Sequence, residues 1–149
     1  MEEKVIAEQF MKGYDCSQVV VSYYAAELGI SEELANKVAA CFGGGMLQAD
    51  TCGAFTGALM VIGLKYGHYD SGKLQTQKEV MMAKSGEFRK KFFEKHPTCN
   101  CKELVGYDVS TPEGFKEAVE TGRMMSFCPK LVKDVIEVLD EMLKSSHSK

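Results

Sequence analysis

The chain has 149 residues, a formal net charge of −3 and a hydrophobic fraction of 45%. This length suits one domain with one core, and the balanced charge argues against a nucleic-acid partner or an anionic membrane surface. The acidic start lacks the basic and apolar regions of a secretory signal, and the longest apolar run, around 58–64, is too short to span a bilayer. We therefore expect a cytoplasmic protein with no nucleic acid bound and no membrane insertion.

Helical periodicity dominates the chain, and strand patterns are scarce. In chain order, the predicted helices cover about 5–12, 16–28, 31–42, 52–66, 73–95 and 102–105, another begins at 111–113, and the last covers 129–143. Residues 145–149 are predicted to be a disordered tail. Because helical patterns dominate, we predict an all-α fold over residues 1–149. Because no repeat or linker interrupts the chain, we predict one domain. It would be a single compact multi-helix domain with about five to seven helices.

Six cysteines are the unusual feature of a chain expected in a reducing compartment. Structural disulfides are rare there, so metal binding or redox chemistry becomes the leading interpretation. The alternative is that each cysteine packs as a small hydrophobic residue. Four of them share a local context, because each lies at the predicted start of a helix: Cys16, Cys52, Cys101 and Cys128.

The residues around these four cysteines are typical of helix starts. DCSQ and NCKE have the form of a capping box, Thr51 places a hydroxyl before Cys52, and Pro129 follows Cys128 at a predicted first helical position. A helix N-terminus exposes unpaired N–H groups, which favour a thiolate over a thiol. A thiolate is both a nucleophile and a metal ligand. If the four cysteines converge in space, we predict that they form one site.

The other two cysteines and the glycines have separate interpretations. Cys41, near the end of a predicted helix, is interpreted as a packing residue. Cys99 forms a CxC pair with Cys101 and is a candidate substitute ligand. Gly53 and Gly57 lie four residues apart on one helix face, which allows close approach of another backbone or of a cluster. The triplet 43–45 predicts a flexible turn or a nest of backbone N–H groups.

The same segments resemble a known family. GYDCSQVV, FGGGM, TCGAFTGALMVIGLKYG, CKELVGYD and FCPKLVKDVIEVL are similar, in this order, to the redox-active proteins named for the signature C_GCAxxG_C_C. The most specific element is CGAxxG at 52–57. The resemblance implies a small helical protein whose signature cysteines are Cys16, Cys52, Cys101 and Cys128. Related domains in multi-cofactor redox proteins point to an iron–sulfur cluster as a cofactor.

Three hypotheses remain open at this point. In the first, the four cysteines bind zinc or an iron–sulfur centre as thiolates for electron transfer, with Gly53 and Gly57 beside it. In the second, they are the redox-active thiols of a cluster-free thiol–disulfide oxidoreductase. In the third, the chain is a non-catalytic helical interaction domain with packed cysteines. The sequence leaves open whether the chain is an enzyme, which redox partner protein it meets and whether it forms a homo-oligomer.

Overall fold

The computed structural model describes the backbone of residues 1–147 and the side chains of residues 1–144. In chain order the helices are α1 (Glu3–Met11), α2 (Cys16–Tyr24), α3 (Glu32–Ala39), the 3-10 turn η1 (Ala40–Phe42), the wide turn η2 (Gly45–Ala49), α4 (Gly53–Tyr66), α5 (Leu74–Lys95), α6 (Cys101–Val105), α7 (Pro112–Glu120) and α8 (Arg123–His147). The predicted all-α fold is confirmed. The described range holds eight α-helices, slightly more than the five to seven predicted. Gly106 and Gly122, at φ 86° and 78°, end the two short helices α6 and α7.

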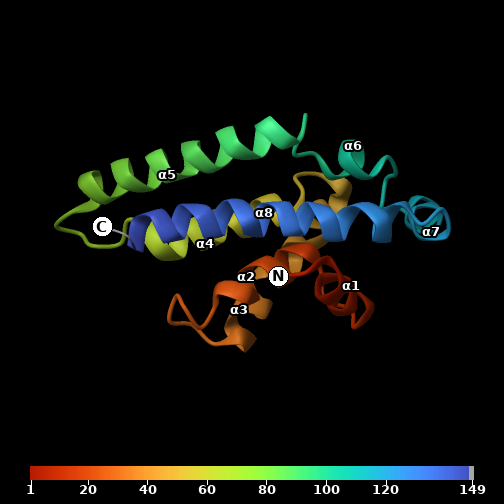
Figure 1. Cartoon of the computed structure of the whole chain (residues 1–149), viewed down its shortest axis with the longest axis horizontal. Coiled ribbons are helices and arrows are strands. Elements are labelled where there is room, and N and C mark those ends of the chain that lie inside the picture. Colours follow the sequence, from red (N-terminus) through yellow and green to blue (C-terminus); the bar gives the residue numbers. More distant parts are fainter. Residues whose placement is uncertain (148–149) are drawn as a thin grey trace.

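The longest helix, α8, organises the molecule (Figure 1). It runs along the long axis, with α5 on one side and α1, α2 and α3 on the other. The apolar helix α4 packs against α2, α5 and α8, and it is enclosed by them. α6 and α7 lie at the same end of the molecule, where both contact or approach the start of α8. The cysteine-bearing segments therefore meet at one end of the bundle.

The core forms around α4. Ala54, Ala58 and Val61 are fully buried, and the Phe55 ring lies 5.4 Å and 5.0 Å from the rings of Phe88 and Phe92 on α5, measured between centroids. α8 contributes the predicted apolar stripe, all of it buried: Leu131, Val132, Val135, Ile136, Leu139 and Leu143. Burial of these side chains, at about 1.5–3 kcal/mol each, is the main source of stability.

Close packing between α2 and α4 explains the glycine face predicted on α4. A Cβ added at Gly57 would lie 3.1 Å from the Ser17 carbonyl oxygen and 3.2 Å from the Val20 Cβ. The buried Ser17 hydroxyl donates a 2.8 Å hydrogen bond to the Ala39 carbonyl, which ties α2 to α3. The start of α2 is thus held by two neighbours.

A buried hydroxyl links α2 to α8 and gives a first testable prediction. Tyr24 donates to the Ile136 carbonyl at 3.0 Å and to Asp140 Oδ1 at 2.8 Å. Tyr24→Phe removes this donor and leaves buried acceptors short of a partner, so we expect the free energy of unfolding to fall by about 1–2 kcal/mol. Urea unfolding measures it. The matched control is Tyr23→Phe, on the neighbouring and more exposed ring, with an expected change below about 0.5 kcal/mol.

The start of α8 differs from the prediction. α8 begins at Arg123, directly after the left-handed Gly122, so Pro129 lies inside the helix rather than at its first position. Proline is favoured at a helix start but is also tolerated inside a helix when packing outweighs the lost hydrogen bond. At the other end, α8 continues to His147, where a tail from Ser145 was predicted, and residues 148 and 149 lie outside the described residues.

Candidate functional site

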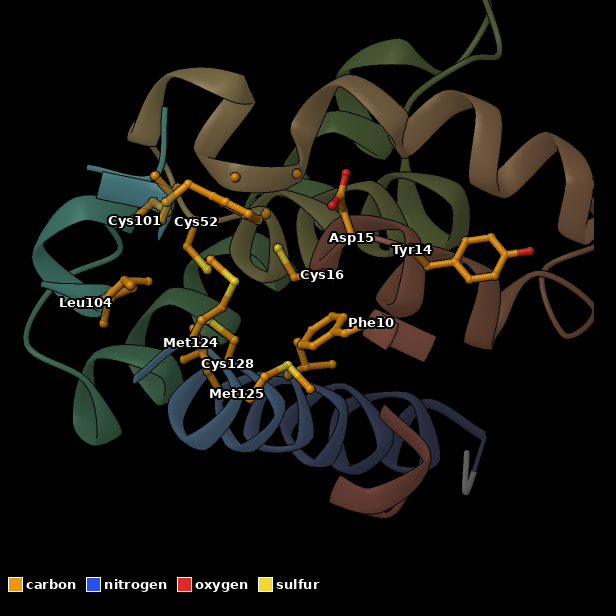
Figure 2. Close-up of a pocket in the computed structure, with 18 of the residues that line it drawn as sticks. Phe10, Tyr14, Asp15, Cys16, Cys52, Cys101, Leu104, Met124, Met125 and Cys128 are labelled. Atoms are coloured by element: carbon orange, nitrogen blue, oxygen red, sulfur yellow. The ribbon is translucent and has the colours of Figure 1, made fainter. Parts of the chain in front are cut away.

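Four cysteines from four separate segments line one pocket of about 660 Å³. Cys16 comes from the start of α2, Cys52 from the residue before α4, Cys101 from the start of α6, and Cys128 from the second turn of α8. Figure 2 shows the four labelled side chains around the same space, with Met124 and Met125 on the α8 side and Phe10 opposite the α6 side. The convergence that the sequence could only suggest is present.

Cys16 is held in place by the cap of α2. Asp15 is the N-cap residue, and its backbone N–H donates a hydrogen bond to the Gln18 Oε1 at 2.9 Å. The predicted capping box is therefore confirmed. Because the Ser17 hydroxyl is hydrogen-bonded to the Ala39 carbonyl of α3, the backbone next to Cys16 is held in place. Its side chain is half-buried at the pocket wall.

Two backbone hydrogen bonds join the segments that carry Cys52 and Cys101. The Cys52 N–H donates to the Cys99 carbonyl at 2.7 Å, and the Cys101 N–H donates to the Asp50 carbonyl at 2.6 Å. The prediction that Thr51 caps α4 is wrong, because Thr51 pairs with Asn100 across the two segments and Cys52 itself is the N-cap residue. The Asn100 cap before Cys101 is confirmed, since its side chain accepts from the Glu103 N–H at 2.9 Å.

Gly53 brings the start of α4 against Cys16. A Cβ at Gly53 would lie 2.5 Å from the Cys16 Sγ and 2.7 Å from the Phe42 carbonyl oxygen, so only glycine allows this approach. Gly53 lines the pocket, whereas Gly57 lies in the contact between α2 and α4 and is absent from the described pocket wall. Of the two glycines predicted to lie beside a cofactor, the structure therefore brings one to the site.

A turn in the left-handed backbone conformation contacts Cys16. Gly44, Gly45, Met46 and Leu47 have φ values of 59°, 65°, 60° and 60°, and the Gly44 N–H points at the Cys16 sulfur as a hydrogen-bond donor. The triplet 43–45 thus supplies the predicted backbone N–H donor. For Met46 and Leu47 this conformation costs about 1–2 kcal/mol per residue. Nothing in the sequence beyond the glycines indicated that two bulky residues would continue the turn.

The thiols of Cys16 and Cys52 form the electrostatic centre of the site. They are joined by a side-chain hydrogen bond, and this bond lowers the pKa of Cys16, with further help from the N–H groups of Gly44 and Ser17. Burial and the nearby Asp15 carboxylate act against it. The same hydrogen bond, together with burial, raises the pKa of Cys52 well above its ordinary value. Within the pair, Cys16 is therefore the more acidic thiol, and Cys52 is the one that holds its proton more tightly.

The other two pocket thiols remain protonated at neutral pH. Burial, followed by the negative charge on Cys16, raises the pKa of Cys101 to about 11 and that of Cys128 to about 12. The prediction that the four cysteines lie at helix starts is confirmed for Cys16, Cys101 and Cys52, the N-cap residue of α4, and is wrong for Cys128, which is inside α8. Of the four thiols expected to be stabilised as thiolates, Cys16 alone has a lowered pKa, and the hydrogen bond with Cys52 is its largest cause. The same bond raises the pKa of Cys52, and burial raises those of Cys101 and Cys128.

These raised pKa values predict alkaline sensitivity. The folded protein holds the protons of Cys101 and Cys128 more tightly than an unfolded chain with an ordinary pKa of 9.0. Their contribution to stability is full below pH 9 and is lost as pH rises through about 11 and 12. Urea unfolding from pH 8 to 12 should show a declining free energy of unfolding, with a shallower decline in Cys128→Ala. An unchanged slope in that variant would contradict the assignment, and the exposed-site variant Cys41→Ala is the control.

The remaining cysteines lie outside the pocket wall. Cys41 is exposed, so its interpretation as a packing residue is wrong; it lies in η1, on the outer side of the turn that follows α3. Cys99 is half-buried against the main core, and its carbonyl binds the Cys52 N–H. Cys101 is the member of the CxC pair that lines the pocket.

The described donor side chains do not form a site for a single metal ion. Among the described residues, no group of three or more Cys, His, Asp or Glu side chains is placed to hold an ion. A structural zinc needs four donors at about 2.0–2.3 Å in a tetrahedron. The donor set as it stands does not fit a mononuclear ion.

Half of the described pocket wall, eleven of its 22 residues, consists of apolar residues that the sequence did not identify as part of a site. They come from α1, η2, α6, the segment between α6 and α7, α7 and α8: Phe10, Leu47, Leu104, Val105, Val109, Phe115, Val119, Met124, Met125, Leu131 and Val132. Each segment alone has an ordinary amphipathic pattern, so the sequence carried no signal for these residues. The structure reveals them because some of these side chains stay exposed after folding. Separately, none of the described helices is both long enough and apolar enough to cross a membrane.

Comparisons with known proteins agree with this site. The family model described as "Putative redox-active protein (C_GCAxxG_C_C)" matches residues 14–142, a range that contains all four pocket cysteines and the glycines between them. Comparisons with curated proteins and with solved structures give no match. The chain therefore belongs to the C_GCAxxG_C_C family of redox-active proteins.

Proposed function

We propose that the chain is a thiol–disulfide redox protein in which Cys16 and Cys52 form the reactive pair. One observation carries the proposal: the two thiols share a hydrogen bond that lowers the pKa of Cys16 and raises the pKa of Cys52. A nucleophilic thiolate beside a protonated thiol is the arrangement that disulfide exchange requires. The high pKa values of Cys101 and Cys128 make them poor competitors for the first attack.

The proposed reaction oxidises the protein dithiol with a disulfide of the form R–S–S–R′. The Cys16 thiolate attacks one sulfur, a Cys16–S–S–R bond forms, and R′–S⁻ leaves. Cys52 then loses its proton and attacks the Cys16 Sγ, so the Cys16–Cys52 disulfide forms and R–S⁻ leaves. Two electrons pass from the protein to the substrate. The Cys52 proton ends on one leaving thiolate, and the other takes up from solvent the proton that Cys16 had already released.

The surrounding residues have defined roles in these steps. The Gly44 N–H stabilises the Cys16 thiolate before attack and aims its sulfur into the pocket. Gly53 permits the close approach that puts the two sulfurs within hydrogen-bond reach. Burial of Cys52 keeps its proton in place until the mixed disulfide has formed, because the Cys16 charge that opposes its ionisation is then gone.

Selective alkylation tests the assignment of the nucleophile. Protein with Cys41→Ser, reduced without air, is treated at pH 7 with one equivalent of iodoacetamide and mapped by mass spectrometry. The expected result is modification of Cys16 ahead of Cys52, Cys99, Cys101 and Cys128. First modification of Cys101 or Cys128 would remove the basis of the proposal, and slow, equal modification of all of them would favour the packed-cysteine hypothesis.

An iron–sulfur cluster in the same pocket is the second candidate function. It is favoured by one observation, the convergence of four cysteines from four segments on a mostly apolar pocket, whereas disulfide chemistry needs only two. Such a cluster would be held by four cysteine thiolates. The cluster would supply one-electron chemistry, and its ligands would be Cys16, Cys52, Cys101 and Cys128.

Metal analysis decides between the two candidates. The protein is expressed and purified without air, and its iron, acid-labile sulfide and zinc contents are measured beside its visible absorption spectrum. The thiol–disulfide proposal predicts colourless protein with stoichiometrically negligible metal and sulfide. Brown protein with matching iron and sulfide, both lost in Cys128→Ser, would replace it with the cluster.

A further inference from the structure

We infer that the pocket over Cys16 selects uncharged, apolar small-molecule disulfides and rejects anionic ones such as glutathione disulfide. The inference rests on the proposed function and adds the substrate class to it. Its basis is the chemistry of the pocket wall, which is independent of the pKa values of the thiols. A pocket of about 660 Å³ lies within the range, about 300–1,000 Å³, that proteins use for small organic ligands.

The described pocket wall carries one charged side chain, and it is negative. Asp15 lies next to Cys16, and no lysine, arginine or histidine is among the described lining residues. An anionic ligand would lose hydration on entry and would meet a carboxylate instead of a cation, which disfavours its binding. Glutathione disulfide carries four carboxylates and has no cationic partner here.

Arg123, whose positive charge acts on the Cys128 thiol, lies outside the described pocket wall and is engaged there. Arg123 donates from Nη2 to the Leu104 carbonyl at 2.8 Å and from Nε to the Val105 carbonyl at 3.2 Å, and its guanidinium stacks 4.2 Å from the Phe127 ring centroid. These contacts fix it at the junction of α6 and α8.

The rim of the pocket offers apolar contacts that folding leaves unused. Leu47, Phe115, Val119 and Met125 are 61%, 51%, 48% and 39% exposed, and all four line the pocket. They come from η2, α7 and α8, so the rim surrounds the entrance from several sides. Beneath them Met124 contributes a flexible side chain that adapts to ligands of different shape. An apolar disulfide can therefore replace water on both rim and wall.

Disulfide kinetics test the selectivity. In a Cys41→Ser background, the rate of reaction with neutral 2,2′-dithiodipyridine is compared with that of the dianionic Ellman reagent, each divided by its rate with free cysteine. We expect the neutral reagent to be favoured at least about tenfold, since the dianion must be desolvated without a cation. The double variant Leu47→Ser/Phe115→Ser should reduce this preference at least threefold. The matched control, Val38→Ser, replaces an exposed apolar side chain of α3 that is outside this pocket and should leave it unchanged.

A binding measurement separates this inference from the proposed reaction. N-phenyl-1-naphthylamine, a neutral apolar fluorophore, should bind reduced protein, and its binding should weaken in the double variant but not in Val38→Ser. Equal normalised rates, or a preference for the dianion, would overturn the inference while leaving Cys16 as the nucleophile. If the preference for the neutral reagent vanishes in Asp15→Asn but survives in the double variant Leu47→Ser/Phe115→Ser, the claim that apolar contacts at the rim select the ligand would be overturned. Fluorophore binding without any reaction at Cys16 would reject the proposed function alone.

Discussion

Cys16→Ser is expected to lower the rate of reaction with a neutral disulfide by at least about tenfold at pH 8. The hydrogen bond with Cys52 lowers the pKa of Cys16, so at this pH Cys16 has a larger thiolate fraction than the other pocket thiols. A thiol with a pKa of about 11, such as Cys101, is about 0.1% thiolate, and its greater intrinsic nucleophilicity makes up only part of that difference. The reaction is followed by release of thiopyridone in protein that also carries Cys41→Ser.

Substitutions at Cys52 should separate its two roles. Cys52→Ser keeps a hydroxyl that can donate to the Cys16 sulfur but cannot form a disulfide, so we expect the mixed disulfide at Cys16 to accumulate. Cys52→Ala removes the donor as well, and the attack itself should slow because the pKa of Cys16 rises. Identical behaviour of the two variants would mean that the hydrogen bond does not activate Cys16, and full turnover in either would assign the second sulfur elsewhere.

Gly53→Ala is expected to have the largest effect on stability, a loss of about 1–3 kcal/mol in the free energy of unfolding. The new Cβ would lie 2.5 Å from the Cys16 Sγ and 2.7 Å from the Phe42 carbonyl oxygen. The sulfur can rotate away, but the carbonyl belongs to the backbone of η1 and can move only with that turn. The displaced sulfur should also react more slowly with disulfides, because it leaves the hydrogen bond with Cys52.

A second glycine on the same helix provides the control. Gly63 lies on the exposed side of α4, and a Cβ there would meet nothing within 4 Å. Gly63→Ala should therefore raise the free energy of unfolding by about 0.5–1 kcal/mol through better helix propensity, with no change in thiol chemistry. Urea unfolding and disulfide kinetics are measured on both variants. A Gly53→Ala protein as stable and reactive as Gly63→Ala would show that the close contact with Cys16 is not required.

The helices themselves could be predicted because their signals are local. Asn100 caps α6 with a side-chain acceptor, as its position predicted. Ser31 and Thr111 do the same at the starts of the helices predicted from 31 and from 111–113, and Pro112 lies at a first helical position. The start of α8 could not be predicted in this way. Its first turn is fixed by the left-handed Gly122 and by packing against α6 and α7, and this outweighs the ordinary preference of Pro129 for a helix start.

The site could be predicted only in part, since its chemistry depends on tertiary contacts. The four cysteines were identified from the sequence, but three of their pKa values were expected in the wrong direction, because a helix-start pattern says nothing of burial. The left-handed conformation of Met46 and Leu47 was also beyond local rules, which disfavour it. The contact between Gly53 and Cys16 joins residues that are 37 positions apart, and the glycine alone indicated only that something comes close.

The disulfide map of the oxidised protein tests the central claim most directly. Reduced protein is equilibrated with mixtures of reduced and oxidised dithiothreitol, its free thiols are blocked, and its peptides are identified by mass spectrometry without reduction. The account predicts one linkage, Cys16–Cys52, which appears and disappears reversibly with the dithiothreitol ratio while Cys101 and Cys128 stay blocked as free thiols. A reversible Cys101–Cys128 linkage, or no defined linkage at any ratio, would contradict it.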